Sequence, residues 1–208
     1  MKRSKLHSVL TAIIDIIYAG LLWLVCSLPV VTLGPASAAL YYAVVKCIRH
    51  ERGSLTKSFF SAFRQNFRLS LPVWLVYLAL LGVGYFNGNL LRSFGLGEGL
   101  PPLLLGNIFF LPLLLTLPWI FPVVSRFDNS FGGTLRFTAA LAVKNLGKSL
   151  LLALELAAAL VIVWLLPQIG PLLPGVFALL QSLMIEPVLR VYTADLHTPD
   201  GDDWFNEE

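Results

Sequence analysis

Long apolar runs alternate with short polar segments along this 208-residue chain. Five of the runs are each close to the roughly 20 residues that a helix needs to cross a bilayer. A sixth, residues 35–48, is shorter. The pattern predicts an all-α, polytopic transmembrane helical bundle with about six membrane segments, the second of them short or re-entrant. The five longer segments are predicted at residues 8–28, 71–91, 101–124, 149–166 and 171–189.

The first two apolar segments are predicted to be separated by a hairpin break at Pro29, Gly34 and Pro35, because these residue types interrupt helices. Residues 35–48 would reach only about 21 Å at the helical rise of about 1.5 Å per residue. This segment either crosses the bilayer with help from residues 29–33 or forms a re-entrant limb. Both alternatives return the chain to the side from which it came.

Residues 54–69 have a different pattern, in which aromatic side chains recur at helical spacing and basic side chains take the opposite face. Two interpretations stay open: an amphipathic helix in the cytoplasmic interface, or a helix packed on the inner ends of the spanning helices. A weaker pattern of this kind covers residues 126–148. The first segment is predicted to offer a surface to a partner or to lipid through Phe59, Phe60, Phe63, Arg64 and Phe67.

The basic residues indicate the orientation of the segments. With six segments, all 15 Lys and Arg residues except Arg92 fall on one side of the membrane. Insertion keeps Lys and Arg of short loops in the cytoplasm, so both termini are predicted to be cytoplasmic. Residues 1–194 are predicted to form one membrane domain, and residues 195–208 an acidic, flexible tail.

The composition agrees with an integral membrane protein, since 57% of the residues are hydrophobic and only 13% are charged. The bases flank the apolar runs, so the net charge of +3 does not indicate nucleic-acid binding. The apolar stretch before residues 36–38 is too long for a cleaved signal peptide. Cys26 and Cys47 are expected at opposite ends of neighbouring helices, which argues against a disulfide, and they have no His neighbours for a metal site.

A weak internal repeat relates residues 42–77 to residues 121–156. With a shift of 79 positions, Gly53 aligns with Gly132 and Asn66 with Asn145. The basic Lys57 aligns with the basic Arg136. Both copies would run in the same direction, which makes a parallel repeat. Chance matches are common in apolar sequence, so duplication and coincidence stay open.

Three acidic residues lie in predicted spans: Asp15, Glu155 and Glu186. A charge in the bilayer centre costs about 2.5–3.5 kcal/mol on insertion scales, so such acids face polar surroundings. They either line a cytoplasm-facing cavity for a cation, a proton or a polar solute, or they are neutralised by bases at the helix ends. In the second case Glu186 would pair with Arg190, four residues later on the same helix.

The sequence contains no recognisable catalytic pattern. Its three His residues are isolated, and it has no metalloprotease, serine-hydrolase or phosphate-loop motif. We therefore expect neither enzymatic activity nor a cofactor or metal.

The run from Leu21 to Ala36, Leu-Leu-Trp-Leu-Val-Cys-Ser-Leu-Pro-Val-Val-Thr-Leu-Gly-Pro-Ala, resembles the opening of the YesL-like family of bacterial multi-pass membrane proteins, also described as domain of unknown function 624. Phe59-Phe60 and the run from Phe63 to Phe67 are similar to that family too. The chain departs from the family at Gly20, where a polar Asn is expected.

The resemblance implies a multi-pass protein of the bacterial plasma membrane whose genes often lie beside those of carbohydrate ABC importers. We therefore expect an accessory membrane protein of a carbohydrate-uptake system, with the lipid bilayer and ABC permease subunits as partners. The alternative is a small solute or ion transporter that uses an acidic cavity open to the cytoplasm.

Overall fold

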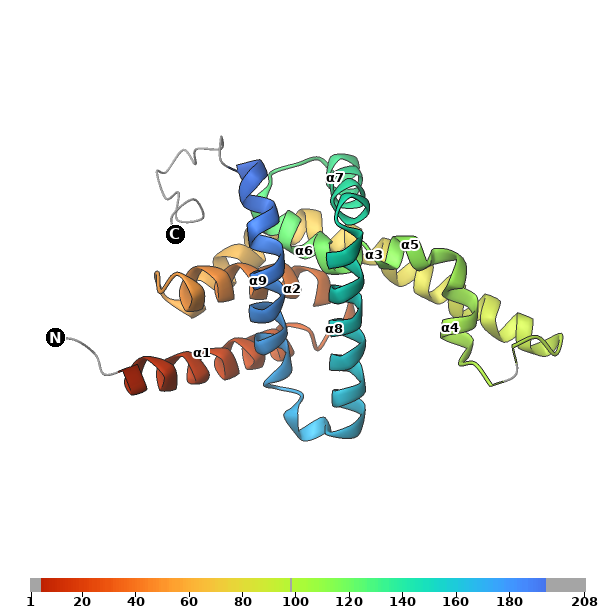
Figure 1. Cartoon of the computed structure of the whole chain (residues 1–208), viewed down its shortest axis with the longest axis horizontal. Helices are drawn as coiled ribbons and strands as arrows, with labels where there is room; N and C mark the ends of the chain where they lie inside the picture. The colour runs from red at the N-terminus through yellow and green to blue at the C-terminus, as the bar shows by residue number, and fades with distance from the viewer. Residues whose placement is uncertain (1–4, 98, 194–208) are drawn as a thin grey trace.

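The computed structural model describes residues 5–97 and 99–193, and all of its regular structure over this range is helical (Figure 1). The predicted all-α membrane bundle is thereby confirmed. The helices, in chain order, are α1 (Lys5–Cys26), η1 (Val30–Thr32), α2 (Leu33–Ala43), η2 (Val44–Arg49), α3 (Leu55–Ser93), α4 (Pro102–Asn107), η3 (Ile108–Phe110), α5 (Leu111–Leu114), α6 (Leu117–Arg126), α7 (Phe131–Lys144), α8 (Leu146–Leu165), η4 (Pro167–Ile169) and α9 (Leu173–Thr193). The acidic tail predicted at residues 195–208 lies outside the described residues.

Four of the described helical stretches are long and apolar enough to cross a membrane: Val30–Arg49, Leu55–Ser93, Leu146–Leu165 and Leu173–Tyr192. The apolar part of α1, Leu10–Cys26, is shorter. Residues 35–48, the short segment of the sequence analysis, lie within Val30–Arg49, because η1, α2 and η2 follow one another without a gap.

The span predicted at residues 101–124 is not one helix. Its chain is divided among α4, η3, α5 and α6, with α6 beginning only at Leu117. The apolar run had predicted one continuous segment here. Proline has no N–H for the helical ladder, so Pro118 in the first turn of α6 cannot bond back to α5, whereas Pro122 lies inside α6 without ending it.

The helix predicted at residues 54–69 is present, but it does not end where the next span was predicted to begin. These residues form the first half of α3, which continues for 39 residues to Ser93. Pro72 lies inside this helix without ending it. A single proline removes one backbone hydrogen bond and bends a helix, whereas ending one needs further breaking residues, which are missing near position 70.

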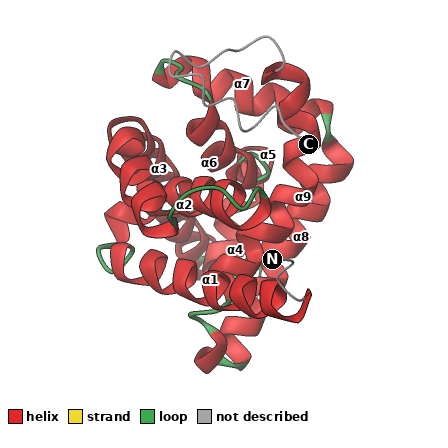
Figure 2. Ribbon diagram, turned by 90° about the vertical axis from the view of Figure 1, so that its left-hand side faces the viewer, coloured by secondary structure: helices red, strands yellow, loops and turns green. Residues whose placement is uncertain are grey.

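α2 lies at the centre of the protein. It contacts α3, α6, α1 and α9, and Figure 2 shows it surrounded by these helices. Small residues permit this position, since Ala36, Ala38, Ala39 and Ala43 are all fully buried. A Cβ atom added at Gly34 would lie 2.5 Å from the Cβ of Trp74 in α3, so the two helices touch through this glycine.

The break between α1 and α2 lies earlier than the predicted one. Pro29 lies in the break, but Gly34 and Pro35 belong to the first turn of α2, where proline needs no helical hydrogen bond. The turn is held by the Thr32 hydroxyl, which donates to the carbonyl of Cys26 at 2.6 Å. The Trp74 indole also donates to the carbonyl of Val30 at 2.8 Å.

Glycines set two further helix contacts. In the arm at the right of Figure 1, α3 packs against α4 so closely that a Cβ atom at Gly88 would lie 1.8 Å from the carbonyl oxygen of Pro102. Where α1 meets α9, a Cβ atom at Gly20 would lie 1.9 Å from the carbonyl oxygen of Pro171. The position at which the family resemblance led us to expect Asn therefore has no room for a side chain here.

Candidate functional site

The most buried ionic group of the described chain lies where α2, α6 and α9 meet. Arg126, in the last turn of α6, donates from Nη2 to Oε2 of Glu186 in α9 at 2.6 Å. The Tyr41 hydroxyl, from α2, donates to the other carboxylate oxygen at 2.9 Å. The side chains of Arg126 and Glu186 are only 4% and 2% exposed. Both oxygens of the acid are thus held by donors from two other helices.

The elements bring these groups together through the hydrophobic core that surrounds them. Tyr41 packs in one cluster with Trp119 and Val123 of α6 and with Ile185 of α9. In one of the two alternatives predicted from the sequence, Glu186 pairs with Arg190 on its own helix. The ion pair that the structure shows is instead with Arg126, because α6 ends beside α9 and turns its last basic side chain inward.

A second polar contact of this region joins η2 to α9. The Arg49 guanidinium donates from Nη1 to the backbone carbonyl of Ser182 at 2.8 Å. Gln181, the residue before, donates from its amide to the carbonyl of Pro118 in α6. α9 is therefore hydrogen-bonded to η2 and to α6. The pattern of apolar runs does not reveal the side chains that form these bonds.

Glu155 in α8 is the least satisfied of the three predicted acids. Both of its carboxylate oxygens are buried, and neither has a hydrogen-bond partner within the described part of the chain. One of the two alternatives predicted from the sequence was that bases at the helix ends neutralise it. Arg126 is engaged by Glu186 instead. An acid without donors is unusual inside an apolar segment, which singles out this position.

The structure does not bring Asp15 and Glu155 into one helix contact. α1 packs against α9, α2, η2 and α3, whereas α8 packs against α9, α6 and α7. Asp15 is half-buried on α1. The shared acidic cavity remains a prediction, and α9 is the element that both helices contact.

The predicted aromatic surface on the first half of α3 needs one correction. Phe59 is fully buried in a core cluster with α2 residues, and Phe63 packs against that cluster. Phe60, by contrast, is 49% exposed, and Arg64 is exposed on the same side of the helix. Phe67 is half-buried. The aromatic stripe thus divides into an inward part and an outward part.

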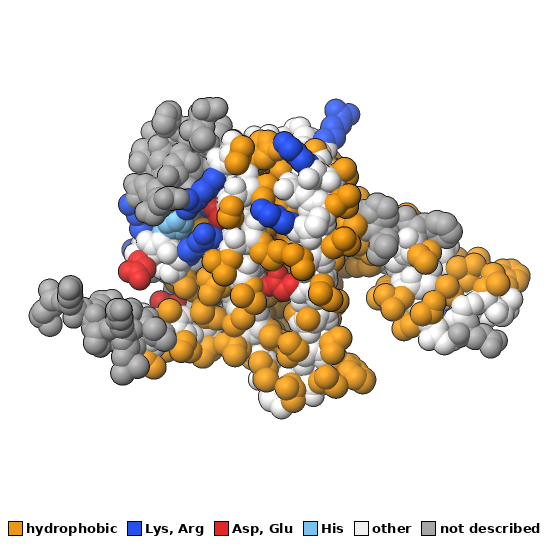
Figure 3. Space-filling model, in the orientation of Figure 1, with side chains coloured by type: hydrophobic (Ala, Val, Ile, Leu, Met, Phe, Trp, Pro, Cys, Tyr) orange, Lys and Arg blue, Asp and Glu red, His pale blue; other side chains and the backbone are white. Residues whose placement is uncertain are grey.

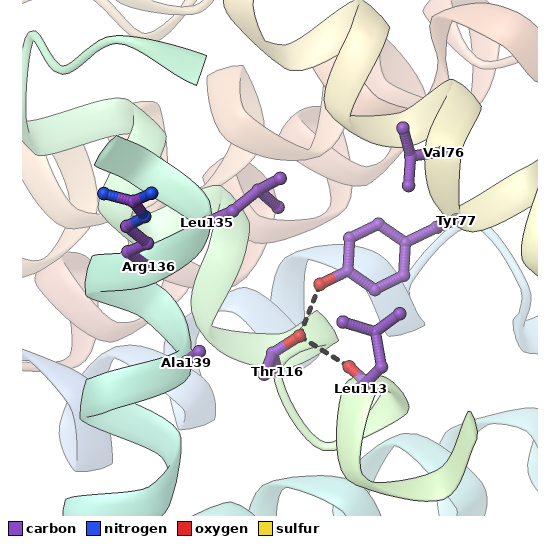
Figure 4. Close-up of a pocket in the computed structure, with 7 residues that line it drawn as sticks. All are labelled: Val76, Tyr77, Leu113, Thr116, Leu135, Arg136 and Ala139. Atoms are coloured by element: carbon purple, nitrogen blue, oxygen red, sulfur yellow. Dashed lines mark hydrogen bonds between the residues drawn. The ribbon is translucent and has the colours of Figure 1, made fainter. Parts of the chain in front are cut away.

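A small cavity lies between α3, α5 and α7 (Figure 4). Its volume is about 280 Å³, and its lining is almost wholly apolar. Tyr77 and Thr116 are hydrogen-bonded to each other across it, and the Arg136 guanidinium is directed away from that pair. The lining residues are Val76, Tyr77, Leu113, Thr116, Leu135, Arg136 and Ala139.

Hydrogen bonds that the sequence analysis did not foresee support the interior. The Trp119 indole donates to the hydroxyl of Ser149 at 2.9 Å, and that hydroxyl donates to the carbonyl of Ala142 at 2.8 Å. Asn66 and Asn145, aligned by the proposed repeat, each donate to the carbonyl four residues earlier at 3.0 Å. These two bonds have the same geometry, but they do not test whether the two segments arose by duplication. The internal repeat stays a prediction.

The fold defines a helical membrane protein, and the comparison with known families makes this more specific. Residues 16–88, from the middle of α1 to near the end of α3, match the family described as "Protein of unknown function, DUF624". YesL-like proteins belong to that family, so the predicted resemblance is confirmed over these residues. No curated protein and no solved structure matches the chain.

Proposed function

We propose that this protein is an accessory integral membrane protein that associates with the permease of a carbohydrate importer and has no catalytic activity of its own. It would lie in the bacterial plasma membrane as a multi-pass protein with both termini in the cytoplasm. The family resemblance supports the partner class through its gene context. The exposed side chains in the first half of α3 support the proposal that this half of the helix contacts the permease.

The observation that carries the proposal is the composition of that exposed face. Lys57, Phe60, Arg64 and Arg68 follow one another at spacings of three and four residues, which places them on one side of α3. All four are exposed, and Phe60 is 49% exposed. An exposed aromatic ring among guanidinium groups is typical of residues that contribute most to protein interfaces, where aromatic residues and Arg are enriched.

The distribution of charge supports the proposed orientation. On the side of the molecule seen in Figure 3, the Lys and Arg side chains gather in the upper half, near α7. The lower half, along α8, is hydrophobic. A cytoplasmic side that carries the bases agrees with the rule for short loops.

The test is co-purification from native membranes in mild detergent, followed by mass spectrometry. We expect importer permease subunits with the wild-type chain and at least tenfold lower recovery with the double variant Phe60→Ser, Arg64→Gln. Phe86→Ser is the matched control, because Phe86 is 69% exposed on the same helix but lies in its second half. Equal recovery with the double variant, or no permease with the wild type, would refute the proposal.

A second candidate function rests on Glu155. A buried carboxylate without a hydrogen-bond partner among the described residues is what a transporter offers to a proton or a cation. If the chain transports, proteoliposomes should show solute or proton flux that Glu155→Gln removes. Flux that is equal in the variant, or absent in the wild type, would rule out this role.

A further inference from the structure

The cavity between α3, α5 and α7 is apolar inside and has a basic residue on its rim. Arg136 of α7 belongs to its lining, together with Val76, Tyr77, Leu113 and Ala139. The Arg136 side chain is exposed, and Figure 4 shows its guanidinium at the α7 edge of the cavity, directed away from Tyr77. The aliphatic stem of this residue therefore lines the cavity, while its charged end lies outside.

The interior of the cavity does not suit a polar solute. Its hydroxyl groups belong to Tyr77 and Thr116, which are hydrogen-bonded to each other. The Thr116 hydroxyl donates to the carbonyl of Leu113 at 2.5 Å, so Tyr77 is the donor of the pair, and both hydroxyl hydrogens are used within the protein. An apolar cavity of about 150 Å³ already stays dry and takes a ligand the size of benzene, and this one measures about 280 Å³. The interior therefore accepts an apolar group.

The rim, by contrast, offers a charge. Within residues 5–97 and 99–193, the Arg136 guanidinium has neither a hydrogen-bond partner nor an ion-pair partner. Val76, on the α3 side of the cavity, is 39% exposed, so the cavity opens to the surroundings between α3 and α7. A guanidinium presents paired N–H donors that match the oxygens of a phosphate. The opening thus combines a phosphate-binding group with an apolar hollow.

The cavity lies across the boundary between headgroups and hydrocarbon in the membrane orientation proposed above. Arg136 belongs to the basic segment 126–148, which the rule for short loops places on the cytoplasmic side. Tyr77 lies six residues inside the span predicted at residues 71–91, or about 9 Å at the helical rise. In Figure 1, α7 lies above the level of α3 and α5. The charged end of the cavity is therefore at the headgroups, and its apolar end is in the hydrocarbon.

We propose that this cavity binds an anionic phospholipid of the cytoplasmic leaflet, with an acyl chain between α3, α5 and α7 and the phosphate at Arg136. Pockets that enclose a whole ligand measure about 300–1,000 Å³, so this smaller cavity takes part of one chain, and the rest of the lipid stays in the bilayer. Basic sites between membrane helices on the cytoplasmic side take anionic headgroups. The inference rests on the membrane orientation of the proposed function but not on its permease.

The test is the thermal unfolding of the purified full-length protein in detergent, because a ligand that binds the folded state raises the unfolding midpoint. The probes are phosphatidylglycerol, the neutral lipid phosphatidylcholine, and glycerol 3-phosphate, which is a headgroup without chains. We expect the highest apparent affinity for phosphatidylglycerol and no effect of glycerol 3-phosphate. Arg136→Gln should lower the affinity for phosphatidylglycerol about tenfold, as the loss of one charge-assisted hydrogen bond does, and leave that for phosphatidylcholine unchanged. Lys57→Gln, an exposed base in the first turn of α3, is the control and should change neither affinity.

A second pair of variants tests the acyl chain. Ala139→Leu fills the cavity from α7 and should lower the affinity for both lipids about tenfold, since the chain loses a contact worth about as much as a buried Leu side chain. Ala140→Leu is the matched control, because Ala140 is the exposed neighbour on α7 and does not line the cavity. Val76→Phe fills the cavity from α3 and replaces Ala139→Leu if that variant does not fold.

Three results would overturn the proposal. Phosphatidylglycerol that acts no more strongly than phosphatidylcholine would mean a general effect of lipid. Glycerol 3-phosphate that acts as strongly as the lipid would mean a phosphate site without a chain. Equal affinities in Ala139→Leu and Ala140→Leu would mean that the lipid binds elsewhere. The sample contains no permease and the cavity variants leave Phe60 and Arg64 in place, so failure here is distinct from failure of the proposed function.

Discussion

α2 and α8 reverse the relation between hydrophobicity and burial that water-soluble proteins show. The stretch that contains α2 has the lower mean hydropathy, 1.4, yet 56% of its apolar window is buried. α8 has a mean hydropathy of 2.1, and only 11% of it is buried. Lipid tails are as apolar as Leu, so burying a Leu gains little in a bilayer. Helices meet instead where residues are small or can form hydrogen bonds.

The two helices carry different side chains for this reason. α2 presents buried Ala residues and the Tyr41 hydroxyl to its neighbours. α8 presents large side chains outward, with Leu154 66% and Trp164 81% exposed. We therefore expect substitutions at the centre to act through polar pairing and close packing, and substitutions on the outer face of α8 to have almost no effect.

The largest effect is expected at the ion pair beside α2. Arg126→Met leaves the Glu186 carboxylate buried without its cation, and breaking such a pair costs about 3–5 kcal/mol. The double variant Arg126→Met, Glu186→Leu should recover most of that loss, because neither charge is then left alone. Chemical unfolding in detergent measures both. A single variant as stable as the wild type would show that the pair does not hold α6 and α9 together.

An intermediate effect is expected where α2 touches α3. Gly34→Ala places a Cβ atom 2.5 Å from the Cβ of Trp74 and 2.9 Å from the Ser70 carbonyl oxygen. Overpacking of this kind costs about 1–3 kcal/mol. Gly147→Ala on α8 is the control, because nothing lies within 4 Å of that position. Unfolding midpoints that fall equally for both would contradict the difference between the helices.

The smallest effect is expected on the lipid-facing side of α8. Leu154→Ala should change the unfolding free energy by less than about 0.5 kcal/mol, as at other exposed positions. Leu152→Ala is the comparison, because Leu152 is fully buried on the inward side of the same helix and its truncation leaves a cavity, so it should cost more than Leu154→Ala. Equal losses at the two positions would mean that α8 is covered on its outer face as well.

The apolar runs predicted the helices well because a bilayer demands long hydrophobic segments. They could not predict where a helix continues or divides. Pro72 and Pro122 both lie inside helices, α3 and α6, whereas Pro118 lies in the first turn of α6, just after the chain divides. Whether a proline falls inside a helix or at its start depends on neighbours that the pattern does not include.

The candidate sites show a similar limit. Asp15, Glu155 and Glu186 could be identified from their place in apolar sequence, but the partner of Glu186 comes from a helix 60 residues away in the chain. Helical spacing marked the stripe from Phe59 to Phe67 without showing which side faces inward. The exposure of Phe60 and the burial of Phe59 depend on the position of α2, which only the assembled helices define.

The continuity of α3 has a mechanical consequence. A 39-residue helix is about 58 Å long at the helical rise of about 1.5 Å per residue, which is nearly twice the thickness of a hydrocarbon core of about 30 Å. Pro72 lies near its middle and has no N–H to offer the carbonyl of Arg68, so bending is easiest there. A force applied at Phe60, in the first half of α3, would therefore bend the helix at Pro72. The second half of α3 would then move together with α4, against which it packs at Gly88.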